Sequence, residues 1–166
     1  MALYFFAMLQ QSIIDQIERY IVEEYPEVFL VDISYKRGKM GLLSIKVDTD
    51  EGISLATCTQ VSRSVSHWLD EQELDDDTFR LEVSSPGVGF PLKLKRQYPQ
   101  NIGRKLRVTL TSGIQEEGTL LKLEEETLYL ERIGKKRSKK SKQEGEDPII
   151  VIPFSDIKES IVVLPF

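Results

Sequence analysis

The sequence predicts an α+β protein of two domains, an N-terminal α-β-β-α-β sandwich followed by a small C-terminal β-barrel. Two segments of the first half repeat apolar residues at three- and four-residue steps, which is the period of one helix face. Five short strand-like segments with tight turns fill most of the second half, as in a small barrel. Between the halves, residues 84–91 are rich in Ser, Pro and Gly, which break regular structure.

The first three elements are a helix and a β-hairpin. Apolar residues at helical spacing extend from Leu9 to Tyr25, and Pro26 ends the pattern. Two runs rich in β-branched and apolar residues, 28–35 and 40–48, follow the helix. Gly38 lies between the two runs and permits a turn, so they predict a hairpin.

A second helix and a third strand complete the first domain. Ser54 has a hydroxyl that can cap free backbone N–H groups, and apolar residues then recur at helical spacing as far as Leu69. The acid-rich run 70–77 ends this helix, and residues 79–83 alternate apolar and polar as a half-buried strand does. We expect the first domain to span residues 1–90, with residues 1–8 as a peripheral apolar leader.

The second domain is expected to span residues 91–166. Its predicted strands are 105–110, 117–123, 127–131, 149–154 and 160–164. Residues 153–157 are expected to form one short helical turn before the closing strand, and that arrangement is typical of SH3-like and Sm-like barrels. A basic loop, 134–147, separates the third and fourth strands.

Composition points to a soluble globular protein, since 40% of the residues are hydrophobic and 30% are charged. Cys58 is the only cysteine, so one chain can form neither a disulfide nor a cysteine-based metal cluster, which fits a reducing compartment. The apolar residues 1–9 lack a basic segment before them, and no run is long enough to span a bilayer. We therefore expect a cytoplasmic protein.

The two halves of the chain differ in charge. Residues 1–80 hold 15 acids and 7 bases, a net charge of −8, whereas residues 81–166 hold 12 acids and 15 bases, a net charge of +3. Because local fields steer association more than net charge does, a polyanion is expected to meet the second half.

Signals of an active site are weak. His67 has no second histidine or thiol at metal-ligand spacing, and Cys58 lies on the apolar face of the second helix. Ser84 and Ser85 stand beside Pro-Gly, outside any Gly-x-Ser-x-Gly elbow. No phosphate-binding glycine motif occurs, and the acids at 70–77 do not follow the spacing of an EF-hand. We predict no enzyme, no cofactor and no metal site.

Two groups of bases are candidates for contact with RNA, because phosphate affinity comes mainly from Lys and Arg. The first group, which lacks intervening acids, comprises Lys93, Lys95, Arg96, Arg104, Lys105 and Arg107. The second, in the basic loop, comprises Lys135, Lys136, Arg137, Lys139, Lys140 and Lys142. The alternatives are a solvated linker face for the first group, and for the second a solubilising insertion balanced by its own acids, Glu144, Glu146 and Asp147.

The ordered motifs resemble the bacterial ribosome maturation factor RimP family. The most specific match is the segment 81–87, Leu-Glu-Val-Ser-Ser-Pro-Gly, followed by Pro91-Leu92. Further matches are Leu30-Val31-Asp32, Cys58-x-x-Val61-Ser62-Arg63, Ile102-Gly103-Arg104-Lys105 and the segment Ile152–Ile157. The family pattern usually carries Asp-Arg where this sequence has Gly89-Phe90, so a contact made by that arginine cannot be transferred to Phe90.

The resemblance implies a cytoplasmic, non-catalytic factor that binds the free small (30S) ribosomal subunit. Such a factor helps a ribosomal protein of the decoding region join ribosomal RNA and then leaves. The implied fold is an α/β domain joined to an SH3-like or Sm-like barrel. The competing hypothesis is a general Sm-like RNA-binding or RNA-chaperone module that acts outside ribosome biogenesis.

The segment Ser84, Ser85, Pro86 and Gly87 predicts a structural corner. Pro86 fixes its own φ and biases Ser85 towards extended geometry, while Gly87 can adopt a positive φ. The two hydroxyls can satisfy nearby backbone groups or donate to a phosphate or to a partner. We favour the structural role over a direct contact.

Overall fold

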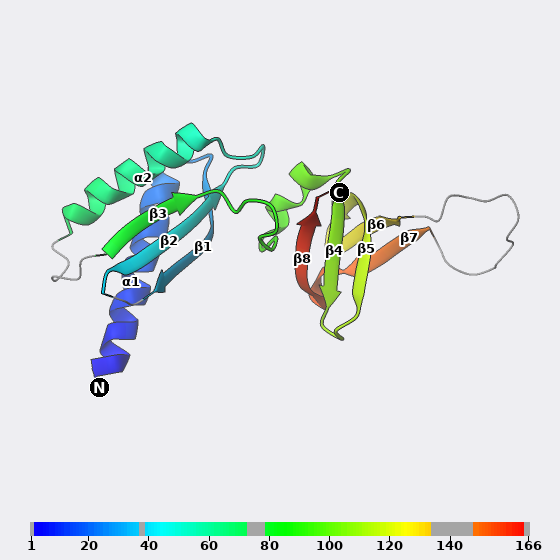
Figure 1. Cartoon of the computed structure of the whole chain (residues 1–166), viewed down its shortest axis with the longest axis horizontal. Coiled ribbons are helices and arrows are strands. Elements are labelled where there is room, and N and C mark those ends of the chain that lie inside the picture. The colour runs from blue at the N-terminus through cyan, green and yellow to red at the C-terminus, as the bar shows by residue number, and fades with distance from the viewer. Residues whose placement is uncertain (1, 37–38, 73–78, 134–147, 165–166) are drawn as a thin grey trace, which may run out of the picture. The chain divides into compact units, whose positions relative to one another are not determined.

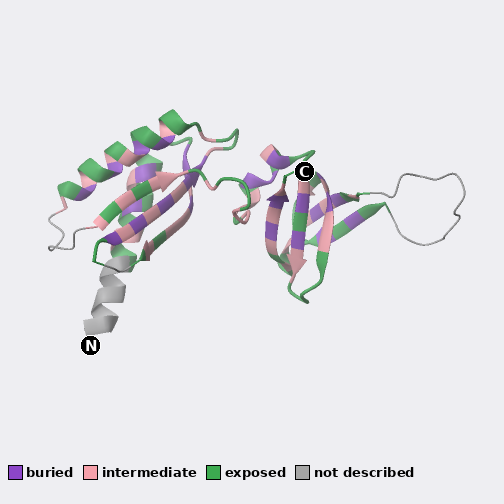
Figure 2. Cartoon of the chain, in the orientation of Figure 1, coloured by how far each residue is buried: buried purple, intermediate pink, exposed green. Residues whose placement is uncertain are grey.

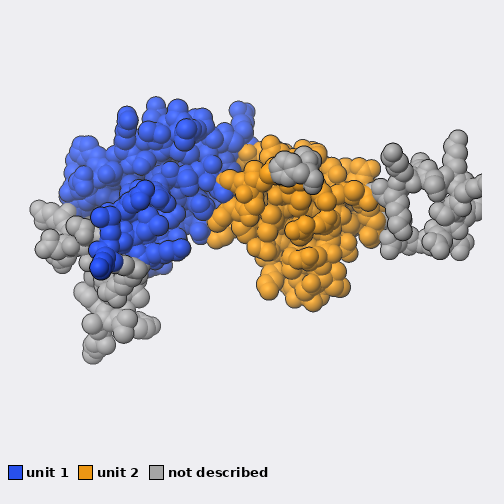
Figure 3. Space-filling view, in the orientation of Figure 1, with its two compact units in different colours: residues 1–86 blue, residues 87–166 orange. Residues whose placement is uncertain are grey.

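The computed structural model describes residues 2–36, 39–72, 79–133 and 148–164, with side chains described from Gln11 onward. The chain forms two compact units, residues 1–86 and 87–166, which Figure 3 shows in blue and orange. Each unit has its own hydrophobic core. No helix among the described residues is both long enough and apolar enough to cross a membrane.

The first unit has the predicted α-β-β-α-β order, which confirms that part of the fold (Figure 1). Its elements are α1 (Ala2–Glu24), β1 (Phe29–Lys36), β2 (Gly41–Asp48), α2 (Leu55–Asp70) and β3 (Phe79–Ser84). The first helix begins at Ala2 and not at Leu9 as predicted. The residues between include alanine, leucine and methionine, which favour helix, and no proline or glycine, so nothing there prevents the helix from extending.

The three strands form one sheet in the order β1-β2-β3. Strands β1 and β2 pair antiparallel, which confirms the predicted hairpin. Strands β2 and β3 pair parallel, and α2 supplies the crossover that a parallel pair requires. Helix α2 begins as predicted, because the Ser54 hydroxyl accepts a hydrogen bond of 3.1 Å from the Thr57 backbone N–H.

Both helices pack on the same face of this sheet. Leu43, Ile45 and Val47 alternate along β2 and are buried against α1 and α2. The helices contribute Ile17, Ile21, Cys58, Val61, Val65 and Leu69 to the same core. The residues that lie between these on β2 are only half-buried, as the alternating colours of the strands show in Figure 2. The other face of the sheet is therefore free of helices among the described residues.

The second unit contains three short 3₁₀ helices and five strands. They are η1 (Lys95–Gln97), η2 (Pro99–Asn101), β4 (Lys105–Leu110), β5 (Gln115–Glu124), β6 (Thr127–Arg132), β7 (Ile149–Pro153), η3 (Phe154–Asp156) and β8 (Ile157–Val163). The short helical turn predicted at 153–157 is confirmed as η3. Helices η1 and η2 were not predicted.

The five strands form an antiparallel sheet in the order β7-β6-β5-β4-β8. One face buries Leu106, Leu120, Leu128, Leu130 and Ile152 in a common core. The predicted α+β class and the five strands of the second half are thus confirmed. Within the part of the chain that the structure describes, β7 and β8 do not pair with each other, so closure into a barrel stays a prediction.

The turn between β5 and β6 yields a test of backbone strain. Glu125 has a φ of 52°, the only positive φ among the described residues other than glycine. A side chain in this conformation costs about 1 kcal/mol, which glycine avoids. We expect Glu125→Gly to raise the melting temperature, whereas Glu125→Ala, which also removes the charge but keeps Cβ, leaves it nearly unchanged. A stabilised alanine variant would show that charge, and not strain, decides the effect.

Candidate nucleic-acid interface

The corner that follows β3 is attached to the rest of the first unit. Lys46 Nζ donates to Ser84 Oγ at 3.5 Å, and the Ser85 backbone N–H hydrogen-bonds to the thiol of Cys58 on α2. Gly87 and Gly89 have φ values of 69° and 87°. No atom lies within 4 Å of an added Cβ at either glycine, so the backbone conformation, and not close packing, favours glycine there.

Asp48, at the end of β2, and Cys58, on α2, are both buried. Asp48 is only 8% exposed, and its Oδ1 accepts from the backbone N–H groups of Thr49 at 2.8 Å and Ile53 at 3.2 Å. Burial raises the pKa of the Cys58 thiol, and the hydrogen bond from Ser85 partly offsets this. A buried thiol with a raised pKa is a poor nucleophile, in keeping with its predicted packing role.

The segment after the corner is packed tightly against the second unit. The Leu92 backbone N–H donates to the Ser160 carbonyl at 2.8 Å, and the Tyr98 hydroxyl donates to Ser160 Oγ at 2.9 Å. Gln97 Oε1 accepts from the backbone N–H groups of Lys93 and Leu94 at 2.8 and 2.9 Å. Burial raises the pKa of Tyr98, and the bond to Ser160 partly offsets it. These buried polar side chains give the neighbouring bases a fixed backbone.

Sequence reasoning missed this scaffold. It assigned no element between residue 91 and the strand predicted at 105–110. The available signal was Pro99 after Tyr98, because proline is favoured at the first position of a helix and here begins η2. Asn101 Nδ2 donates to the Gln97 carbonyl at 2.7 Å, and such a bond between adjacent turns is not visible in composition or periodicity.

The bases around η1 lie beside aromatic rings and an acid. Lys93 Nζ lies 5.5 Å from the centre of the Phe90 ring. Lys95 Nζ lies 5.1 Å from the centre of the Phe154 ring and forms an ion pair with Glu126. Arg96, on the same turn, is exposed. This arrangement keeps the Lys93 and Lys95 stems ordered while their ammonium groups stay near the surface.

The bases of β4 share one acid. Arg107 Nε donates to Glu117 Oε1 at 2.7 Å, and Lys105 Nζ lies 2.9 Å from Glu117 Oε2. These two hydrogen bonds lower the pKa of Glu117 below its ordinary value of 4.5. Arg104, just before the strand, is exposed and donates weakly to Asn101 Oδ1 at 3.4 Å. The β4 bases thus form a compact, partly neutralised group.

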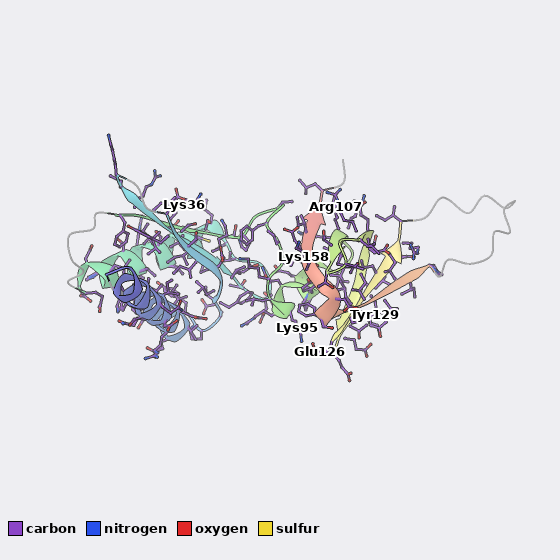
Figure 4. All side chains as sticks on the ribbon, turned by 90° about the horizontal axis from the view of Figure 1, so that it is seen from below. Lys36, Lys95, Arg107, Glu126, Tyr129 and Lys158 are labelled. Carbon is purple, nitrogen blue, oxygen red and sulfur yellow. The ribbon has the colours of Figure 1, made fainter. Side chains whose placement is uncertain are left out.

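The structure does not bring all six predicted bases to one place. Figure 4 shows Lys95 beside Glu126 on one side of the second unit and Arg107 on another. Sequence reasoning noted that no acid interrupts the stretch, but Glu117 and Glu126 reach these bases from neighbouring strands. Lys135, Lys136, Arg137, Lys139, Lys140 and Lys142 lie outside the described residues.

Enzyme-like groups are scattered. The His67 side chain is 77% exposed and lies 3.5 Å from Glu71 on the same helix. Cys58 is buried at the other end of α2. No group of three potential metal ligands occurs in the described ranges of the chain.

Comparison with known proteins agrees with the motifs. A family model described as the RimP N-terminal domain matches residues 17–89. A ribosome maturation factor RimP of Flavobacterium psychrophilum is 37% identical over 147 residues, which cover 86% of this chain and 90% of the relative. The chain belongs to the RimP family.

Other RimP relatives match a similarly large share of the chain. The protein of Christiangramia forsetii is 34% identical over 162 residues, covering 96% of this chain and 100% of the relative. That of Cytophaga hutchinsonii is 32% identical over 153 residues, covering 88% of this chain and 91% of the relative. The similarity to RimP proteins thus extends through both units. At Phe90, which departs from the usual family pattern, this chain places a ring against Lys93.

The buried Tyr98–Ser160 hydrogen bond provides a test of the scaffold. Ser160→Ala leaves the Tyr98 hydroxyl buried without its partner, so we expect a loss of about 1–3 kcal/mol in the free energy of unfolding. Tyr98→Phe is expected to cost about 1 kcal/mol. The double variant should cost less than the sum, measured by urea denaturation. Strict additivity would contradict coupling between the two side chains.

Glu117 provides a pH-dependent test. Its pKa is lower in the folded chain than in the unfolded chain, so its carboxylate stabilises the fold above about pH 4.5 and this contribution is lost as pH falls through the lowered value. We expect Glu117→Gln to lower the melting temperature slightly at pH 7 and to match the parent protein in acid. Glu131→Gln, on the same sheet, is the control. If both variants differed from the parent protein in melting temperature by the same pH-dependent amount, the assignment of this effect to Glu117 would be contradicted.

Proposed function

We propose that this chain is a cytoplasmic ribosome maturation factor that binds the free small (30S) ribosomal subunit and promotes its assembly without catalysing a reaction. The observation that carries the proposal is identity of 32–37% to proteins named ribosome maturation factor RimP, over most of their length.

We assign contact with ribosomal RNA to the bases of the second unit. Lys93, Lys95 and Arg96 stand on or beside η1, and Arg104, Lys105 and Arg107 stand at the start of β4. Their backbones are held by buried hydrogen bonds, so ordering them on RNA costs little additional entropy. Such contacts recognise phosphates and shape more than base sequence.

The second component is a ribosomal protein of the decoding region, which the factor helps to join the RNA. Two compact units connected by the short segment from Gly87 to Pro91 can hold two components of one particle. Holding both raises the effective concentration of one near the other. The mechanism needs binding and release, and it requires no bond to be made or broken.

Sedimentation of a cell lysate tests the proposal. We expect the protein to migrate with free small subunits and not with intact ribosomes, and cells that lack it should accumulate free subunits with immature small-subunit RNA. A diffuse distribution that follows messenger RNA would instead support a general RNA-binding module. A normal ribosome profile in the deletion strain would contradict the proposal.

A further inference from the structure

The face of the N-terminal sheet opposite the helices has a distinct chemistry. On β2, the residues between the buried Leu43, Ile45 and Val47 point away from the core. The register places the following side chains on this helix-free face: Asp32, Ser34, Lys36, Leu42, Ser44, Lys46, Arg80, Glu82 and Ser84. Leu42 is the only large apolar side chain in this set. The register continues this face to Phe29 and Asp48, which are buried, so the solvated part of the face is the part that these nine residues form.

Bases outnumber acids on this face, in contrast to the rest of the unit. It carries three bases and two acids, whereas residues 1–86 as a whole hold 7 bases and 16 acids. Helix α1 alone holds four acids and one base. Glu82 lies 3.6 Å from Arg80, and Asp32 stands opposite Lys46 in the strand register, so each acid has a base beside it. Asp48 extends the face at its other end, so the excess of bases belongs to the hairpin end, where Lys36 and Arg80 lie.

The bases gather at the hairpin end of the face. Lys36, Leu42 and Arg80 are aligned across β1, β2 and β3, so the backbones of the two bases are about 10 Å apart. The Arg80 side chain is 70% exposed, and Lys36 and the neighbouring Lys39 are exposed as well. Figure 4 marks Lys36 on the side of its strand away from α1. Two bases at this separation can neutralise phosphates along one nucleic-acid strand.

The other side chains of the face favour a backbone ligand over a base. Ser34, Ser44 and Ser84 supply hydroxyls that hydrogen-bond to phosphate or ribose oxygens. None of the nine residues is aromatic, so the face offers no platform on which bases stack. On β3 the polar face ends at Ser84, whose Oγ accepts a hydrogen bond from Lys46 Nζ. The polar face therefore continues directly into the corner after β3.

We propose that the helix-free face of the N-terminal sheet, with Lys36 and Arg80 as its principal contacts, binds the sugar-phosphate backbone of ribosomal RNA. This site is separate from the bases of the second unit, and the inference rests on the proposed function. It gives the first unit its own contact with the particle, despite the unit's negative charge. Helix α1, which carries four acids and one base, then faces away from the RNA.

The test compares two charge-matched pairs in the full chain. The first is Lys36→Gln with Arg80→Gln on the sheet face, and the control is Arg19→Gln with Arg63→Gln, two exposed arginines on α1 and α2. Binding is measured to purified free small subunits and to protein-free small-subunit RNA across a series of salt concentrations. Circular dichroism and the melting temperature establish that all variants fold.

For the sheet-face pair we expect the slope of log affinity against log salt to fall by about 1.5, with an affinity loss of about tenfold at low salt. The control pair should change both quantities far less. Equal losses for the two pairs, or no loss for the sheet-face pair, would overturn the inference. A loss on subunits that is absent on protein-free RNA would also overturn it, because the ligand would then be a protein. Failure of the parent protein to bind subunits would instead reject the proposed function itself.

Discussion

The buried polar network around Tyr98, Gln97, Asn101 and Ser160 is the constraint on which the rest of the second unit depends. It attaches residues 92–104 to β8 and fixes two 3₁₀ helices that have little apolar surface of their own. Buried amides and hydroxyls are costly when unpaired, and every buried side-chain nitrogen and oxygen among the described residues has a partner. The segment therefore has one favourable conformation. Its bases are presented from a fixed backbone, and the connection between the corner and this segment is only the short stretch Gly87–Pro91.

Acids within the fold moderate the bases that this scaffold presents. Glu117 lies between Lys105 and Arg107, and Glu126 holds Lys95 against Phe154. Such exposed pairs contribute little to stability, but they order the long side chains and lower the local positive potential. A ligand with a higher density of negative charge than a single carboxylate, such as an RNA backbone, can displace them. Binding of this kind is reversible and sensitive to salt.

Much of the fold followed from local pattern, because periodicity and caps are properties of neighbouring residues. Ser54 at the start of α2, the antiparallel pairing of β1 with β2 and the turn at η3 were all predicted in place. The ion pairs between acids and bases were not predicted, because Glu117 meets Arg107 only through the register of β4 and β5, which is a tertiary property. The helix-free face was missed for the same reason. Lys36 and Arg80 are 44 positions apart and become neighbours only when β3 adds parallel to β2. The start of α1 at Ala2 was missed because the apolar leader lacks the amphipathic period, although its residues favour helix.

The corner after β3 connects the two sets of bases, and its chemistry explains why it is so specific a segment. Ser84 is the last residue of the helix-free face and accepts a hydrogen bond from Lys46. The backbone N–H of Ser85 hydrogen-bonds to the buried thiol of Cys58. Gly87 then turns the chain with a positive φ that other residues adopt only with strain. Proline at position 85 would remove the backbone N–H that holds the corner to α2, whereas a side chain at Gly87 would strain the exit from it. Either change would alter how the first unit and the scaffolded segment are joined without removing a single base. If both units contact one RNA, binding depends on this junction through effective concentration, so the corner affects affinity without itself touching the ligand. A structural corner and a functional signature are then the same feature.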